Sequence, residues 1–258
     1  MGRLSLALLG PVAVTLDGEP VTGFESDKVR ALLAYLAVEA DRPHRRAVLA
    51  GLLWPERPDQ AAHANLRNAL ANLRRAIGDG HASPPFLLIT REAIQFNRAS
   101  DYALDLTELA ALSGREAIDQ LEAAVALYRG TFLEGFSLKE SSAFEDWSLL
   151  VRERLQRQVL TALARLAEAY EERGEARRAC DYAWRQVELE PWHEEAHQQL
   201  MHLLALSGQR SAALAQYEAC RRILREELGV EPARETTALY ERIRSEQGLR
   251  VRPRVTGP

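Results

Sequence analysis

The chain has 258 residues, of which 47% are hydrophobic and 27% are charged. This composition is typical of a soluble globular protein of about two domains and excludes a disordered or collagen-like chain. Gly10-Pro11 interrupts the apolar start, and no apolar run approaches the roughly 20 residues of a membrane span, so we expect neither a secretory leader nor a membrane partner. Two cysteines, Cys180 and Cys220, are too few for a disulfide framework and indicate a cytoplasmic protein.

The formal net charge of −4 conceals an uneven distribution. Residues 1–99 hold 12 Lys+Arg against 10 Asp+Glu (net +2), whereas residues 100–258 hold 21 against 27 (net −6). Seven arginines fall within residues 42–75 beside only Glu56 and Asp59, a local excess of +5. Arginine provides 31 of the 33 cations, so the bias is partly compositional, but its local excess favours an anionic partner for the first half of the chain.

Residues 1–99 predict a small domain of strands, three helices and a hairpin. Apolar side chains alternate along residues 4–8 and 12–16, which is typical of strands. From Ser26 the period becomes helical, and Pro43, Pro55 and Gly78 end three successive helices. The expected apolar faces of these helices are Val29, Leu32, Leu33 and Leu36; Val48, Leu49, Leu52 and Leu53; and Ala62, Leu66, Ala69, Leu70, Leu73 and Ile77.

Two further apolar runs, residues 86–90 and 94–96, flank Arg91-Glu92-Ala93 and predict a terminal hairpin. Strands, three helices and then a hairpin within about 100 residues is the order of elements in a winged helix-turn-helix domain.

Helical periodicity continues after Asp101, where strand signals vanish. The expected helices cover residues 105–112, 115–129, 142–172, 175–189, 193–207, 210–227 and 233–246. Residues 166–174 align with residues 200–208 at a spacing of 34, and Ala179 and Ala213 keep that spacing. This is the period of the tetratricopeptide repeat, in which small residues let paired helices approach each other. A generic helical bundle is the alternative.

The predicted fold class is therefore mainly α with a small β component. We expect a winged helix-turn-helix domain in residues 1–99, an all-α tetratricopeptide-like repeat domain in residues 100–250 and a tail in residues 251–258.

The third helix has a polar face opposite its apolar stripe. At about 100° per residue, Asn68, Asn72 and Arg75 lie on this face between alanines. Asn65, Arg67 and Arg74 lie on its flanks. Arginine can bind guanine or phosphate, asparagine can pair with adenine, and alanine permits close approach, so we expect this face to bind double-stranded DNA. The alternative is a solvated Arg-rich helix without a ligand.

Three arginines outside the third helix are further candidates for DNA contact. Arg45 and Arg46 begin the second helix, where side chains and free backbone N–H groups can hold phosphate. Arg91 lies at the hairpin tip, from which it can enter the minor groove. We expect Trp54, between the second and third helices, to pack over them rather than to stack on a base.

No motif for catalysis or a cofactor is predicted. His193-Glu194-Glu195-Ala196-His197 matches the zincin pattern, but it lies in the first turn of a repeat helix, where acidic residues are ordinary dipole partners. Phosphate-binding loops, dinucleotide turns and nucleophile elbows do not occur in the sequence. We therefore expect no metal, no cofactor and no enzyme activity. The residues expected in apolar cores are Cys180, Cys220 and the aromatic cluster Tyr128, Phe132, Phe136, Phe144 and Trp147.

The two halves together resemble a known family. LALLGPVAV (residues 6–14), KVRALLAYL (28–36), LLWP (52–55) and the helix of residues 65–78 look like the DNA-binding domain of Streptomyces antibiotic regulatory proteins. The segments YRG (128–130), FLEGF (132–136), FEDW (144–147) and ELGVEP (227–232) look like the bacterial transcriptional activator domain of that family. The resemblance covers about residues 4–247.

The resemblance implies a transcriptional activator. In this family an OmpR-like winged helix binds direct repeats near promoters, and the loop between its second and third helices faces RNA polymerase. Carried onto this chain, this implies base contacts from Asn68, Asn72 and Arg75. It also implies a polymerase-facing loop, residues 53–59, with Trp54, Glu56, Arg57 and Asp59 as its contact residues.

The hairpin departs from the family pattern, because Arg91-Glu92-Ala93 replaces the usual glycines and Glu92 would sit poorly against phosphate. The implied partners are promoter DNA and RNA polymerase, and self-association through the helical domain stays open. The alternative function is a helical-repeat scaffold for protein partners without specific DNA binding.

Overall fold

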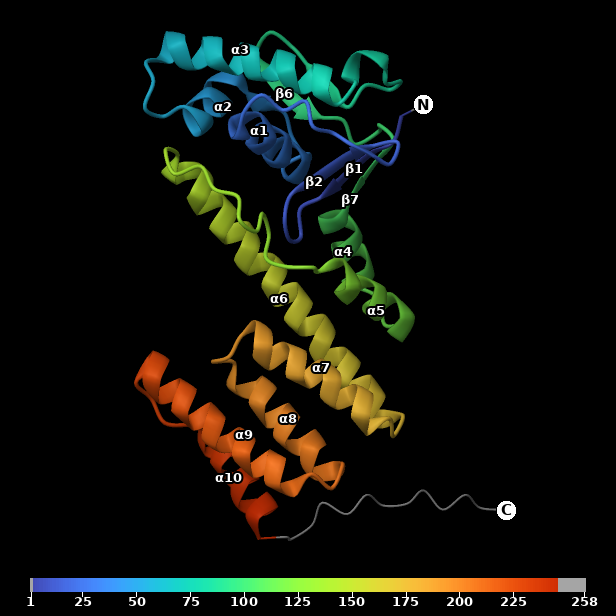
Figure 1. The fold of residues 1–258 in the computed structure, drawn as a ribbon, viewed down its shortest axis with the longest axis vertical. Coiled ribbons are helices and arrows are strands. Elements are labelled where there is room, and N and C mark those ends of the chain that lie inside the picture. The colour runs from blue at the N-terminus through green and yellow to red at the C-terminus, as the bar shows by residue number, and fades with distance from the viewer. Residues whose placement is uncertain (1, 246–258) are drawn as a thin grey trace, which may run out of the picture. The chain divides into compact units, whose positions relative to one another are not determined.

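A computed structural model describes residues 2–245 of the chain, which are mainly helical with a small sheet component, as the sequence predicts (Figure 1). The chain divides into two compact units. Unit 1 comprises the residues up to 114 together with 126–156, and unit 2 comprises 115–125 and the residues from 157 onward. The predicted boundary after residue 99 stays a prediction, and the predicted tail, residues 251–258, lies outside the described residues.

Unit 1 begins with a four-stranded sheet in the order β3-β2-β1-β7. Its strands are β1 (Leu4–Ala7), β2 (Ala13–Leu16), β3 (Glu19–Pro20) and β7 (Tyr102–Leu104). Leu6 lies opposite Val14 in the antiparallel β1–β2 pair and opposite Leu104 in the parallel β1–β7 pair. Strand β7 shows that the expected absence of strands after Asp101 was wrong, because three residues are too few to show a period of two.

Three helices and a second sheet complete the N-terminal part of unit 1. They are α1 (Asp27–Val38), α2 (Arg46–Leu53), α3 (Asp59–Ala76), the 3-10 turn η1 (Asp79–His81) and the strands β4 (His44–Arg45), β5 (Leu87–Ile89) and β6 (Ala93–Phe96). The predicted hairpin is confirmed as β5–β6, and β4 adds to it with Arg45 opposite Ala93. This pairing moves the start of α2 to Arg46. Val48, expected on the core face of α2, is 54% exposed, because Leu49, Ala50 and Leu53 fill that face.

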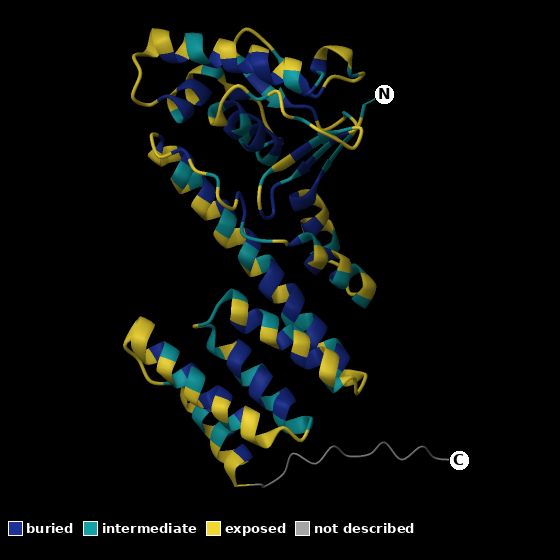
Figure 2. Ribbon diagram, in the orientation of Figure 1, coloured by how far each residue is buried: buried dark blue, intermediate teal, exposed yellow. Residues whose placement is uncertain are grey.

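Residues 126–156 pack onto the N-terminal part of unit 1. The predicted aromatic core is confirmed for Tyr128, Phe132 and Phe144, which are buried, whereas Phe136 and Trp147 are half-buried. The ring centroid of Trp147 lies 5.7 Å from that of Phe132 and 5.1 Å from that of Phe144. Its further partner is Tyr35 of α1, whose ring centroid lies 4.9 Å from that of Trp147. The indole Nε1 of Trp147 also donates to Glu39 Oε1 at 3.0 Å. The core of unit 1 therefore joins segments more than a hundred positions apart in the sequence (Figure 2).

Unit 2 consists of helices. Helix α4 (Asp105–Ser113) belongs to unit 1, and α5 (Ile118–Leu127) and α6 (Ser142–Glu172) each contribute residues to both units. The other described elements of unit 2 are α7 (Ala176–Leu189), α8 (Glu194–Leu206), α9 (Arg210–Ile223), the π turn η2 (Leu224–Leu228) and α10 (Arg234–Arg244). These bounds confirm the expected helices to within a few residues, except that α9 passes into η2 four residues before its expected end. Residue 246, the expected last residue of the final helix, lies outside the described residues.

The spacing of 34 residues in the sequence corresponds to repeated local structure in unit 2. Gly174 and Gly208 both adopt left-handed backbone conformations, with φ of 76° and 75°. The residue after each glycine donates to a carbonyl five positions back, Glu175 to Tyr170 at 2.9 Å and Gln209 to Leu204 at 2.8 Å. Each glycine thus ends one helix of a pair in the same way. Ala179 and Ala213 are fully buried at equivalent points of the next helices.

A carboxylate on α5 fastens that helix to the rest of unit 2. The hydroxyls of Tyr170 and Tyr182 donate to Glu122 Oε1 at 2.8 and 2.7 Å, and Arg178 pairs with the same oxygen at 2.6 Å. The hydrogen bond from Tyr182, followed by the other contacts, lowers the pKa of Glu122 despite its partial burial.

The buried carboxylate of Asp105 connects α4, β1 and residues 126–156 within unit 1. Its Oδ2 accepts hydrogen bonds from the backbone N–H groups of Leu8 and Leu9, both at 2.8 Å, and lies 3.4 Å from the guanidinium of Arg129. The N–H groups of Leu8 and Leu9 come at the end of β1, where the sheet offers them no partner strand. The carboxylate therefore replaces sheet hydrogen bonds at this edge.

We expect Asp105→Ala to lower the free energy of unfolding by about 3 kcal/mol, because two buried N–H groups would lose a charged acceptor. Urea unfolding of the whole chain measures this. The control is Asp101→Ala, whose carboxylate is exposed and lies 4.0 Å from Arg3, and which should change stability by less than about 0.5 kcal/mol. Equal effects of the two substitutions would contradict this account of Asp105.

Candidate nucleic-acid interface

Helix α3 buries one face and exposes the other. The predicted apolar stripe is confirmed: Ala62, Leu66, Ala69, Leu70, Leu73 and Ile77 are all buried. On the opposite side Arg67, Asn68 and Arg75 are exposed, and Asn65 is partly buried at the edge of the stripe (Figure 2). Helices α1 and α2 both contact α3. The period of apolar residues thus fixes which face of α3 reaches solvent.

Asn72 does not belong to the exposed face. It is 2% exposed, and its side-chain amide binds the loop that precedes α1. Oδ1 accepts from the backbone N–H of Glu25 at 3.1 Å, and Nδ2 donates to the carbonyl of Gly23 at 3.0 Å. The prediction that Asn72 contacts a DNA base is wrong, because the loop of residues 21–25 covers it. The helical period could not reveal this cover, since the loop is a distant part of the sequence.

The same loop places a carboxylate beside Arg75. Arg75 NH2 lies 2.5 Å from Glu25 Oε1, and both side chains are mostly exposed. An exposed ion pair of this kind contributes at most about 1 kcal/mol. Arg75 therefore remains accessible to an anion that can displace Glu25.

Two other predicted contact residues have structural partners. Arg74 Nε donates to Oδ2 of the buried Asp79 at 2.9 Å, and Oδ1 of Asp79 accepts from the N–H of Leu87 at 3.0 Å. Arg46 donates from Nε and NH2 to the carbonyl of Thr90 at 3.1 and 3.0 Å. Both arginines thus hold the hairpin β5–β6 to the helices, while Arg45 beside them is exposed.

The turn of the hairpin is built by a hydroxyl. Thr90 Oγ1 accepts from the backbone N–H groups of Glu92 and Ala93 at 3.2 and 3.0 Å. These bonds close the turn without the glycines that the family pattern has. Arg91 and Glu92 are both exposed on it.

The loop between α2 and α3, residues 54–58, is short and fixed. Trp54 is 7% exposed, which confirms that it packs and excludes its ring from the predicted polymerase contact. Lys28 Nζ lies 5.6 Å from the centre of this ring and 3.3 Å from Glu56 Oε1. A backbone hydrogen bond, followed by Lys28, lowers the pKa of Glu56. Glu56, Arg57 and Asp59 are exposed. The sequence reasoning missed Lys28, since no period or motif relates it to this loop.

The histidines of the zincin-like motif have other partners. The ring of His197 is buried, with Nε2 bonded to the carbonyl of Pro191 at 2.8 Å and Nδ1 to Gln216 Nε2 at 2.7 Å. Glu194 Oε1 accepts from Thr236 and from the N–H of Ala233 at the start of α10. His197 and Glu194 therefore connect helices of unit 2. Within residues 2–245 no cluster of three or more potential metal ligands occurs.

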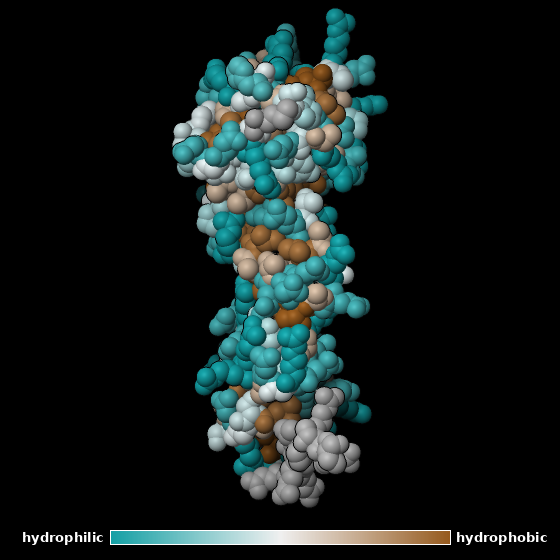
Figure 3. Space-filling view, turned by 90° about the vertical axis from the view of Figure 1, so that its right-hand side faces the viewer, coloured by the Kyte–Doolittle hydropathy of each residue, from teal (hydrophilic) through white to brown (hydrophobic). Residues whose placement is uncertain are grey.

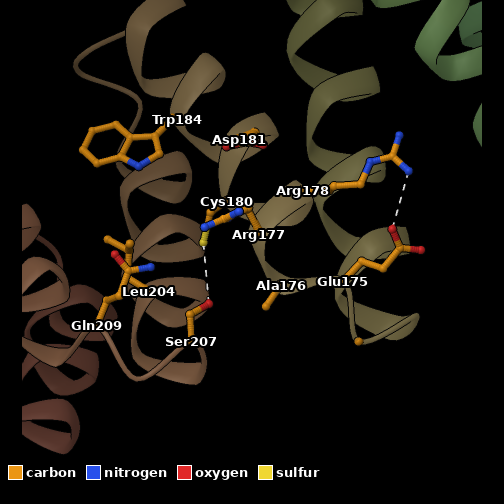
Figure 4. Close-up of a pocket in the computed structure, with 11 residues that line it drawn as sticks. Glu175, Ala176, Arg177, Arg178, Cys180, Asp181, Trp184, Leu204, Ser207 and Gln209 are labelled. Atoms are coloured by element: carbon orange, nitrogen blue, oxygen red, sulfur yellow. Dashed lines mark hydrogen bonds and ion pairs between the residues drawn. The ribbon is translucent and has the colours of Figure 1, made fainter.

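Unit 2 also contains a cavity of about 810 Å³ beside the start of α7 (Figure 4). It is lined by Arg177, Cys180, Trp184, Ser207 and residues around them. The thiol of Cys180 lies 3.9 Å from Ser207 Oγ, and burial raises the pKa of this thiol. Burial also raises the pKa of Cys220, to about 12. Both thiols are thus weak nucleophiles at neutral pH, consistent with their predicted place in the core.

The surface of the described residues carries few large apolar side chains, and hydrophilic residues cover most of the face in Figure 3. None of the helices between residues 2 and 245 combines the length and the apolar content that a membrane span requires.

Comparison with known proteins identifies the class of this chain. The family described as "Bacterial transcriptional activator domain" matches residues 95–244. The chain therefore belongs to this family, the activators of the Streptomyces antibiotic regulatory protein type, as the resemblance implied.

The relatives are named as regulators. Transcriptional regulatory protein EmbR of Mycobacterium tuberculosis is 31% identical over 96% of this chain and 65% of its own length. Regulatory protein AfsR of Streptomyces coelicolor is 30% identical over 94% of this chain and 24% of its own length. A solved structure, "Mycobacterium tuberculosis EmbR in complex with low affinity phosphopeptide", has a TM-score of 0.75 and 28% identity and covers 97% of this chain and 67% of its own. The chain thus spans about 65% of the length of its EmbR relatives.

We expect Asn72→Ala to lower the free energy of unfolding by about 2 kcal/mol, because the N–H of Glu25 and the carbonyl of Gly23 would lose their partner. Asn68→Ala, four residues earlier on the exposed face, should change it by less than about 0.5 kcal/mol. Thermal or urea unfolding of both variants measures the difference. A destabilising Asn68→Ala beside a neutral Asn72→Ala would reverse the roles assigned here.

Proposed function

We propose that this chain is a DNA-binding transcriptional activator that binds promoter direct repeats and contacts RNA polymerase. The observation that carries the proposal is the exposed polar face of α3, where Arg67, Asn68 and Arg75 stand opposite a buried apolar stripe. Such a helix can enter the major groove, where arginine reads guanine and asparagine reads adenine.

The arrangement around α3 supports a winged helix-turn-helix. Helices α1 and α2 precede α3, and the hairpin β5–β6 follows it. Arg46 and Arg74 tie the hairpin to the helices, so that the hairpin and α3 form one surface. We infer that Arg45, which is exposed opposite Ala93 at the start of β6, and Arg91, which is exposed two residues before Ala93, contact phosphate or the minor groove.

We further infer that unit 2 is a tetratricopeptide-like repeat. The matched glycines Gly174 and Gly208 and the matched alanines Ala179 and Ala213 support this. In the proposed function unit 2 supplies protein contacts, and Glu56, Arg57 and Asp59 face RNA polymerase. Activation of this kind requires no catalytic group or cofactor and takes place in the cytoplasm.

We expect DNA affinity to fall linearly with salt on a log–log plot, because phosphate contacts release counterions. Asn68→Ala should weaken binding to the selected sequence by about 5- to 150-fold, since one bidentate base contact provides about 1–3 kcal/mol. Arg67→Ala and Arg75→Ala should weaken it as well. Fluorescence anisotropy with DNA obtained by binding-site selection measures these effects.

The matched control is Arg154→Ala, which removes an exposed arginine of α6 and should leave DNA affinity unchanged. If selection recovers no preferred sequence and the α3 variants bind DNA like the unsubstituted chain, the chain is instead a repeat scaffold for protein partners.

A further inference from the structure

We propose that residues 138–147 of the activator domain position the loop between α2 and α3, so that the polymerase-facing surface is complete only when this segment is docked on it. The inference rests on the proposed function for the role of the loop. The positioning itself rests on contacts within unit 1, which join residues inside the family match, 95–244, to residues before it.

The first contact is an ion-pair bridge. Lys28 Nζ lies 3.3 Å from Glu56 Oε1 of the loop and 3.1 Å from Glu140 Oε2 of the activator segment. The side chain of Lys28 is only 16% exposed, and its ammonium lies over the ring of Trp54. One ammonium therefore links both carboxylates to the buried indole that begins the loop. Both carboxylates are exposed, so each ion pair contributes at most about 1 kcal/mol, and the shielded ammonium supplies the fixed point of the bridge.

The second contact is a hydrogen bond to the backbone just before the loop. Ser141 is fully buried, and its hydroxyl donates to the carbonyl of Leu52, in the last turn of α2. The same hydroxyl accepts from the N–H of Phe144 at 3.2 Å, which caps the start of α6. The serine thus ties the end of α2 to the start of α6.

The aromatic contacts hold the segment in place. Trp147, one and a half turns along α6, contacts Tyr35 and donates to Glu39 at the end of α1. Lys28 lies in the first turn of α1. Helix α1 is therefore bound by the segment at both ends, and its first turn carries the ammonium that reaches the loop.

These contacts fix a loop that has few bonds of its own. Pro55 and Pro58 lack N–H groups, and inside the loop the Arg57 N–H donates to the carbonyl of Trp54 at 3.1 Å. Arg57 also lies 3.7 Å from Glu56 within the loop, so among the described contacts the ion pair with Lys28 is the one that links Glu56 to another element, and Ser141 fixes the residue before the loop. Lys28, Glu140 and Ser141 are thus positioning residues, which act through the loop rather than on polymerase.

The test compares Lys28→Met and Glu140→Gln with two controls, all in the full chain. Lys28→Arg keeps the bridging charge, and Glu153→Gln removes an exposed carboxylate elsewhere on α6. The readouts are amide hydrogen exchange of residues 54–57, DNA affinity, and transcription by RNA polymerase from a promoter that carries the selected sequence.

For Lys28→Met and Glu140→Gln we expect faster amide exchange in the loop and transcription reduced by about threefold or more. The DNA affinity of both variants should stay within about twofold of that of the unsubstituted chain. Both controls should match the unsubstituted chain. Because Glu140 is exposed, its substitution keeps the test valid even if Lys28→Met unfolds.

Unchanged loop exchange in both variants would overturn the positioning role. The proposed function fails differently: if Arg57→Ala leaves transcription intact while Lys28→Met still speeds loop exchange, the positioning stands and the loop does not face polymerase.

Discussion

The carboxylate of Asp105 is the contact on which the architecture of unit 1 depends. It accepts the two N–H groups at the end of β1 and pairs with Arg129, so it joins the first strand, α4 and the activator segment at one buried point. Burying a charge costs free energy unless it is fully paired. Residues from three parts of the chain meet at Oδ2, whereas Oδ1 is buried without a hydrogen bond to any described residue, so the favourable contacts of this carboxylate are all made through Oδ2. The aromatic contacts of Trp147 with Phe132 and with Tyr35 of α1 extend the same junction.

This junction changes the meaning of the family match. A match over residues 95–244 suggests an activator domain that begins where the elements proposed to bind DNA end. In the structure, residues 126–156 complete the core of the unit that holds α3. Strand β7, which pairs with β1, and Trp147, which packs against Tyr35 of α1, both come from beyond residue 100. The elements proposed to bind DNA and the start of the activator domain thus belong to one compact unit, although their sequence signatures are separate.

The sequence predicted most of the helices and the buried stripe of α3, because helical periods are long enough to identify a face. It failed where a contact joins distant segments. Strand β7 has only three residues, too few to show a period. Val48 lies outside the core because Leu49, Ala50 and Leu53 already occupy the buried face of the short helix α2. Asn72 had the right residue type and the right angular position for a base contact, but the loop that covers it is distant in sequence, with its contact residue Glu25 47 positions earlier in the chain. Lys28 carried no signal, because its partners Glu56 and Glu140 are defined only by the fold.

Part of the local excess of positive charge is neutralised by carboxylates elsewhere in the fold. Of the arginines between residues 42 and 75, Arg74 neutralises the buried Asp79, and Arg75 faces Glu25. The first ion pair serves the fold, because Asp79 could not stay buried without it. The second lies on the exposed face and opposes any phosphate that approaches, since a carboxylate beside an anion costs Coulomb energy. If α3 binds DNA as proposed, the DNA must displace Glu25 from Arg75, and a sequence that offers Arg75 a bidentate guanine would offset that displacement better than a single phosphate oxygen. Under the proposed function, the ion pair between Arg75 and Glu25 would lower DNA affinity in general and favour discrimination between sequences.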